Sequence, residues 1–220
     1  KLNSKMSINN RCVLMKHNNF NSKNENIGRD SLLEQRNNQK PVLNIIGYKY
    51  YELGLFDTND KRITILKDFL QEKLITYIEE GYEWFITHGS IGIELFAVEV
   101  LIELKRLGYH LNIAIIEPFI QQPKDELNDW QIRRNKVIGQ VEYHNYIYQK
   151  RYEGPWMFKG ANLFMMEHST ASLIFYDESS NSNLKYYYNA LVDYSSNHVY
   201  NVLRVSFDEL NDFISFNYDN

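Results

Sequence analysis

Residues 83–94 read Glu-Trp-Phe-Ile-Thr-His-Gly-Ser-Ile-Gly-Ile-Glu, and they indicate the fold class more clearly than any other segment. The apolar run Glu83–Thr87 is typical of a buried strand. It enters a turn that contains two glycines, and the apolar helix expected over Ile93–Leu107 follows directly. A buried strand that turns into a helix in this way is typical of a crossover unit in a parallel sheet. The stretch therefore predicts an α/β protein.

The segments on both sides of this unit continue the alternation of strands and helices. Such alternation predicts right-handed crossovers, so we expect a doubly wound, mainly parallel sheet of about six strands with helices on both faces. The other expected strands are Val42–Gly47, Leu111–Ile116, Tyr143–Tyr148, Ser172–Tyr176 and Val199–Val205, and the other expected helices are Asp60–Glu80, about 125–140, Trp156–His168, Leu184–Tyr194 and Asp208–Phe213.

The first forty residues differ in composition from the rest of the chain. They are rich in Asn and Lys, and neither a helical nor a strand period persists in them. We interpret residues 1–40 as a disordered or loosely docked basic arm, and residues 41–220 as the folded domain. The positive charge of the arm could attract nucleic acid or anionic lipid. The alternatives are a solvated tail, or residues that precede a true start at Met6 or Met15.

Composition excludes several classes of protein. The net charge is −4 although the arm is basic, so residues 41–220 are strongly acidic and DNA is an unlikely partner. One cysteine allows neither an intramolecular disulfide nor a zinc site with two cysteine ligands, and the six histidines show no helical pairing, so no metal site is expected. We find no apolar run long enough to span a membrane and no export signal, and we expect a cytoplasmic protein.

In a doubly wound sheet, ligands bind at the carboxyl ends of the strands, near the point where the strand order reverses. The segment after the first strand, residues 47–59, is long for a strand-to-helix connection, and long loops are often functional. Its candidate ligand-binding residues are Gly47, Tyr48, Lys49 and Glu52. Lys49 would offset phosphate charge. The alternative for the aromatic residues of this loop is that they only pack it against the domain.

The glycine turn after the second strand is the best candidate for a phosphate site. The amides of Gly89, Ser90, Ile91 and Gly92 stand at the start of a helix, where exposed N–H groups and the helix dipole favour an anion. Glu94, in the first helical turn, would accept hydrogen bonds from a ribose; its alternative role is to compensate the helix dipole. The turn matches neither a P-loop nor the nucleophile elbow of a hydrolase.

Later strand ends and the helix between them supply further candidates. A base could stack on Phe119, or on Tyr48 of the first loop, and each of these residues could instead be structural. The candidates are Pro118 and Phe119, Tyr176 and Asp177, and Lys159 and Asn162 on the intervening helix.

Taken in order, these motifs resemble the YpsA family of low-GC Gram-positive bacteria, which belongs to the SLOG superfamily. The resemblance covers about residues 42–213 and implies a Rossmann-like domain that binds a nucleotide or an ADP-ribose-like ligand, with Gly92 and Glu94 as the functional pair. It is carried by Gly47-Tyr48-Lys49, Glu52-Leu53, Phe56, Gly89, Gly92, Glu94-Leu95, Pro118-Phe119, Tyr152, Gly154-Pro155, Phe158-Lys159, Asn162, Ser169 and Tyr176-Asp177.

Three functional hypotheses follow. The first is a non-catalytic regulator that binds a nucleotide-derived ligand and serves cell-division or stress control. The second is a nucleotide N-glycosidase like the related Lonely-guy enzymes, with Glu94 or Glu52 as the catalytic carboxylate. The second motif of those enzymes, P-G-G-x-G-T-x-x-E, is absent from this sequence. The third is a module that binds DNA, as DprA proteins do, or a protein partner. A homo-oligomer is compatible with each hypothesis.

Overall fold

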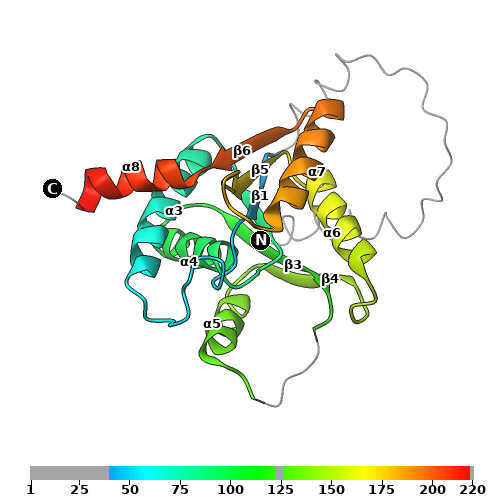
Figure 1. Ribbon diagram of the computed structural model, residues 1–220, viewed down its shortest axis with the longest axis horizontal. Helices are drawn as coiled ribbons and strands as arrows, with labels where there is room; N and C mark the ends of the chain where they lie inside the picture. Colours follow the sequence, from blue (N-terminus) through cyan, green and yellow to red (C-terminus); the bar gives the residue numbers. More distant parts are fainter. Residues whose placement is uncertain (1–39, 122–125, 219–220) are drawn as a thin grey trace. The chain divides into compact units, whose positions relative to one another are not determined.

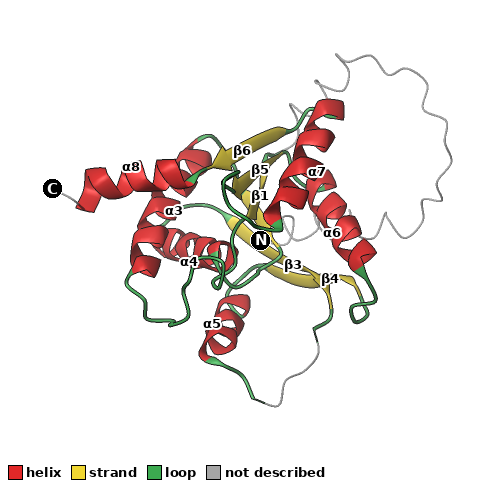
Figure 2. Cartoon of the chain, viewed as in Figure 1, coloured by secondary structure: helices red, strands yellow, loops and turns green. Residues whose placement is uncertain are grey.

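The computed structural model describes residues 40–121 and 126–218, so all of the expected arm except Lys40 lies outside the described residues. Strands and helices alternate along the described chain, as the sequence predicts (Figures 1 and 2). The elements are β1 (Val42–Ile46), α3 (Arg62–Glu79), β2 (Trp84–Thr87), α4 (Ile93–Arg106), β3 (Asn112–Phe119), α5 (Asp129–Ile138), β4 (Tyr143–Tyr148), α6 (Pro155–Glu167), β5 (Ala171–Phe175), α7 (Leu184–Asn197), β6 (Asn201–Val205) and α8 (Phe207–Tyr218).

The six strands form one parallel sheet in the order β4-β3-β2-β1-β5-β6. The chain therefore adds strands in one direction from β1 to β4 and then crosses back to place β5 on the other side of β1. This arrangement confirms the predicted doubly wound fold. It places the reversal of strand order between β1 and β5, and a ligand is expected near that point in such sheets.

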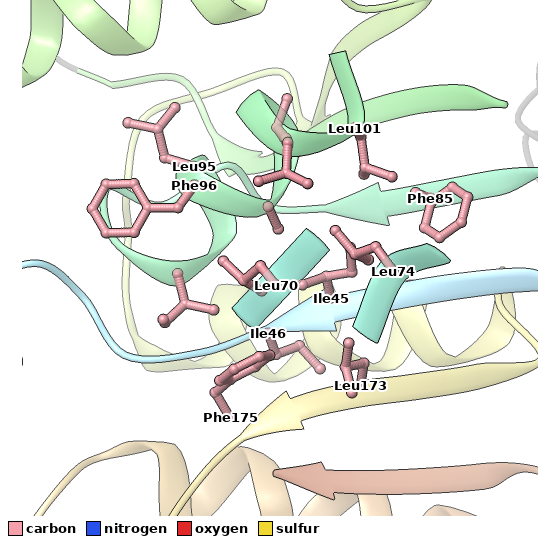
Figure 3. Packing of buried hydrophobic residues seen from close by; sticks show 14 of the residues in the cluster. Ile45, Ile46, Leu70, Leu74, Phe85, Leu95, Phe96, Leu101, Leu173 and Phe175 are labelled. Carbon is pink, nitrogen blue, oxygen red and sulfur yellow. The ribbon is translucent and has the colours of Figure 1, made fainter. Parts of the chain in front are cut away.

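The helices cover both faces of the sheet. In Figure 1, α6 and α7 lie side by side, on the opposite side of the strands from α3 and α4. Because side chains alternate along a strand, β1 contributes side chains to both faces of the sheet. Ile45 packs with Leu70 and Leu74 of α3, as Figure 3 shows, whereas the amide of Asn44 reaches Tyr187 of α7. The α3 face is thus an apolar core, and the α7 face is partly polar.

Most boundaries lie within two residues of those expected, whereas the start of α5 and the ends of β3, α7 and α8 differ by three residues or more. β3 continues through Pro118 to Phe119, because β2 ends opposite Ile115 and the missing N–H of a proline beyond that point breaks no ladder with β2. Helix α5 begins later than expected, at Asp129, because the Asn128 side chain caps it in a reciprocal pair with Gln131. None of the helices in the described ranges is long and apolar enough to cross a membrane.

Candidate functional site

A cavity of about 1020 Å³ opens at the carboxyl ends of β1, β2 and β3 and is walled by α6 and α7. It lies next to the reversal of strand order, where the fold predicts a ligand site. The cavity brings together more than half of the residues that the sequence singles out. Those that line it are Gly47, Lys49, Glu52, Ser90, Glu94, Pro118, Lys159 and Asn162.

Glu94 is held at the cavity wall by the glycine turn. Its side chain is 5% exposed, and its Oε2 accepts hydrogen bonds from Thr87 Oγ1 at 2.7 Å and from the Ser90 amide at 3.0 Å. None of the described residues donates a hydrogen bond to Oε1. The carboxylate is therefore fixed through one oxygen and retains a second acceptor that can serve a ligand.

Other parts of the protein pack against the two glycines of the turn, in the space that a Cβ would occupy. A Cβ on Gly92 would lie 2.2 Å from the carbonyl oxygen of Tyr48, and this glycine has a φ of +142°. Lys49 pairs with Gly92 in an antiparallel bridge, and the Ile93 amide donates to Tyr48 O at 3.0 Å. A Cβ on Gly89 would lie 2.7 Å from Cγ2 of Ile115. The segment after β1 thus covers the start of α4.

This packing changes the expected role of the main-chain amides. The amide of Ser90 donates to Glu94, that of Ile93 to Tyr48, and that of Gly89 to Thr87. The main chain of Ile91 is also engaged through its carbonyl oxygen, which accepts from the Tyr50 amide at 2.9 Å. A phosphate would therefore have to compete for the amides of Gly89, Ser90 and Ile93, whereas those of Ile91 and Gly92 donate to no acceptor among the described residues.

Two of the predicted site residues in the segment after β1 hold this segment in place through contacts with the rest of the protein. Tyr48 is 3% exposed, and its ring stacks on Phe207 with 5.1 Å between centroids. Glu52 accepts from the Lys49 amide at 2.9 Å and from Ser182 Oγ at 2.5 Å, so both carboxylate oxygens are engaged. The Lys49 side chain is exposed at the cavity. Of these residues, Lys49 has the polar group that is most available to a ligand.

The two residues after β5 lie outside the cavity lining. The Asp177 carboxylate accepts from the amide and hydroxyl of Ser179 and from the Phe207 amide, and these bonds hold the pKa of Asp177 below its usual value. Its own amide donates to the hydroxyl of Tyr48 at 2.8 Å. Burial raises the pKa of the Tyr176 phenol, whose ring packs on Tyr188. Both residues have structural contacts here.

The α6 side of the cavity combines a cation with aromatic rings. Lys159 and Asn162 line it, together with Phe158. Phe158 packs with Phe119 and Tyr152, with centroid distances of 5.2 and 5.5 Å, and Phe119 and Tyr152 lie 5.1 Å apart. Phe158 is 44% exposed and Tyr152 48% exposed. We call these three residues the aromatic rim; they offer ring faces beside a positive charge.

His88 and Tyr187 are among the polar residues of the cavity that the sequence does not single out. His88 follows β2 directly, and its place before the glycines is the one signal that could have selected it. Tyr187 stands between two other tyrosines on α7, and periodicity does not show which of the three faces the sheet. Its hydroxyl accepts a hydrogen bond from Asn44 Nδ2 at 3.2 Å.

A buried ion cluster supports the glycine turn from the other side. Glu117, 2% exposed, pairs with Arg134 at 2.9 Å and with His144 at 2.8 Å. Arg134 Nε also donates to the Gly89 carbonyl at 2.7 Å. The cluster therefore ties α5, β3 and β4 to the turn that carries Glu94. Across residues 40–121 and 126–218, no three His, Cys, Asp or Glu side chains gather closely enough to hold a metal ion.

Comparison with known proteins agrees with this architecture. The YpsA family model, described as the YspA SLOG family, matches residues 43–210. A UPF0398 protein of Macrococcus caseolyticus is 32% identical over 78% of this chain and 93% of its own length. UPF0398 proteins of Staphylococcus haemolyticus and Staphylococcus aureus are 34% and 37% identical, each over 78% of this chain and 91% of their own length. The chain therefore belongs to the YpsA family of SLOG proteins.

Proposed function

We propose that this protein is a cytoplasmic regulator that binds a nucleotide-derived molecule of the ADP-ribose type without turning it over. The observation that carries the proposal is the cavity of about 1020 Å³ at the carboxyl edge of the sheet. Small-molecule sites typically measure about 300–1,000 Å³, so a ligand as large as a dinucleotide can be accommodated. A regulator of this kind would act through a protein partner or a second copy of the chain.

The cavity offers complementary groups for each part of such a ligand. The free oxygen of Glu94 suits the sugar, because a carboxylate accepts hydrogen bonds and repels phosphate. Lys159 and Lys49 are the lysines that line the cavity, so we place the phosphates near them in preference to the glycine turn, where three amides already donate hydrogen bonds within the protein. The aromatic rim would stack on the base through Phe158.

Thermal unfolding with ADP-ribose, NAD and AMP tests the proposal. A ligand at about 100 times its Kd should add about 2.7 kcal/mol to the free energy of unfolding. Lys159→Glu should reduce this stabilisation, whereas Lys136→Glu, on an exposed position of α5, should preserve it. Absence of stabilisation by all three compounds, or equal stabilisation of both variants, would contradict the proposed site.

The free carboxylate oxygen of Glu94 also favours a second candidate, hydrolysis of a nucleotide N-glycosidic bond. Glu94 would stabilise the positive charge that develops on the sugar while water replaces the base at C1′. Glu52 is less suited to this role because both of its oxygens are engaged. Release of free base from AMP that disappears in Glu94→Gln would support hydrolysis, and absence of release at high protein concentration would exclude it for that substrate.

A further inference from the structure

The polar floor of the cavity consists of His88, Glu94 and Tyr187, with Asn44 behind Tyr187. Both ring nitrogens of His88 have clear assignments. Nδ1 lies 2.8 Å from the carbonyl oxygen of Ile116, which can only accept, so Nδ1 carries the hydrogen. In the neutral ring Nε2 is then an acceptor. It is buried and has no hydrogen-bond partner among the described residues.

Tyr187 contributes a donor to the same floor. Its oxygen accepts from Asn44 Nδ2, and none of the described residues accepts its phenolic hydrogen. Burial is the main cause that raises the pKa of Tyr187, and the negative charge of Glu94 adds to the effect, so the phenol keeps its hydrogen at neutral pH. The ring lies beside His88, with 6.4 Å between the two centroids.

Asn44 holds this phenol in place from within the sheet. It is 1% exposed, and its Nδ2 also donates to Ser172 Oγ at 3.0 Å. Ser172 in turn shares a hydrogen bond of 2.6 Å with the hydroxyl of Tyr200. The Tyr187 hydroxyl is thus anchored to β1 and β5, the two strands that flank the reversal of strand order.

The hydrogen-bonding atoms of the floor that have no partner in the described part of the protein define what it can bind. Glu94 Oε1 and His88 Nε2 require donors, and Tyr187 supplies one hydrogen. His88 Nε2 is a buried acceptor without a partner among the described residues, as is Asn44 Oδ1 behind the Tyr187 hydroxyl, so a donor on the ligand would be favourable there. Phosphate oxygens at neutral pH are mainly acceptors and would leave both needs unmet. A hydroxyl group both donates and accepts, so two neighbouring hydroxyls would satisfy all three groups.

We propose that His88, Glu94 and Tyr187 form a subsite for a vicinal diol, such as the 2′- and 3′-hydroxyls of a ribose. The inference rests on the proposed function, because it assigns the sugar end of that ligand. Because His88 Nε2 is buried, a diol bonds to it only when the groups that cover this nitrogen move aside. Deoxy sugars and free phosphate are poor occupants of this subsite.

Calorimetry with AMP, 2′-deoxy-AMP and 3′-deoxy-AMP tests the diol subsite. We expect each deoxy compound to bind the unaltered protein at least about tenfold more weakly than AMP, since each lacks a bond to the floor. In Tyr187→Phe the affinity for AMP should fall, and the gap between AMP and at least one deoxy analogue should shrink. Tyr188→Phe is the matched control, because Tyr188 follows Tyr187 on α7 but lies outside the cavity lining.

The possible failures are distinguishable. If AMP and both deoxy compounds bind equally well, and Lys159→Glu weakens all of them, the cavity binds nucleotides but the diol subsite is refuted. If no nucleotide binds the unaltered protein, the proposed function and the subsite fall together. Because Tyr187→Phe removes one oxygen from a buried site, far-ultraviolet circular dichroism is recorded for each variant. If Tyr187→Phe unfolds, His88→Gln, which keeps polar atoms at its position, gives the same comparison between AMP and its deoxy analogues.

Discussion

Gly92 has a different role from the one that its motif predicts. The sequence indicates a residue that lets a ligand approach the main chain. The structure shows that Tyr48 and Lys49 make this approach, with the Tyr48 carbonyl 2.2 Å from where a Cβ would stand. Loss of function in a Gly92 variant would therefore report the packing of this segment as well as any ligand contact.

We expect Gly92→Ala to lower the free energy of unfolding by more than about 3 kcal/mol, because the strained φ and the backbone collision add together. Gly54→Ala is the control. Gly54 also has a positive φ, +64°, but a Cβ there meets nothing within 4 Å, so the expected cost is about 1 kcal/mol. Urea unfolding measures both values. Similar losses in the two variants would show that the contact with Tyr48 does not matter.

Arg134 is a second residue whose importance comes from its surroundings. Its guanidinium pairs with buried Glu117 and donates to the Gly89 carbonyl. We expect Arg134→Gln to cost about 3 kcal/mol of unfolding free energy, because it leaves a buried carboxylate without its cation. Lys136→Gln, exposed on the same helix, should change stability by less than about 0.5 kcal/mol. Denaturant midpoints decide this, and equal values for both variants would contradict the role of the cluster.

At the level of helices and strands, the sequence predicts nearly everything that local patterns encode. Apolar runs such as the one before Gly47 and the glycines after α3 and α4 mark where elements begin and end. The extension of β3 through Pro118 escapes prediction, because it depends on where the neighbouring strand β2 stops. The stacking of Tyr48 on Phe207 also escapes prediction, since it joins residues far apart in the sequence.

In the candidate site, too, local patterns and topology predict some residues, whereas others depend on packing between distant parts of the chain. Topology places strand ends together, so the sequence is enough to assign Lys49, Glu94 and Pro118 to one site. It is not enough to assign Tyr187, because its position in the cavity depends on the rotation of α7 against the sheet. Asp177 follows β5 at the carboxyl edge of the sheet, as the sequence predicts, but its carboxylate is directed to Ser179 and to the start of α8.

From the contact between Asp177 and α8 we predict how the stability of the fold depends on pH. Hydrogen bonds from Ser179, and then from the Phe207 amide, lower the pKa of Asp177 from 3.8. The charged carboxylate therefore stabilises the fold above pH 3.8, and this contribution is lost as the pH falls below that value through the lowered folded-state pKa. Asp177→Asn should be less stable than the unaltered protein at about pH 6, and the difference should shrink towards about pH 3.

Asp212→Asn serves as the control for this measurement, because the Asp212 carboxylate accepts no hydrogen bond from the residues that the structure describes. Its stability relative to the unaltered protein should vary little over the same range. A deficit in Asp177→Asn that stays constant from neutral to acidic pH would mean that the capping contact with α8 contributes nothing through its charge.

For the molecule as a whole, the two faces of the sheet have different tasks. The face under α3 and α4 holds the apolar core, with Phe85, Leu95 and Leu101 among its buried side chains. The face under α6 and α7 contains the cavity and the polar floor. Stability and ligand binding therefore rest largely on opposite sides of one sheet, and a substitution that blocks the cavity should leave the fold nearly unchanged.

Asn162→Trp tests this separation. Asn162 is half-buried on α6 and lines the cavity, so an indole there would occupy the proposed ligand volume. We expect the stabilisation by ADP-ribose to disappear while the free energy of unfolding without ligand changes by less than about 1 kcal/mol. Asn135→Trp, exposed on α5, should keep the full ligand effect. If ADP-ribose stabilises both variants equally, the ligand binds elsewhere, and the cavity at the carboxyl ends of β1, β2 and β3 is not the functional site.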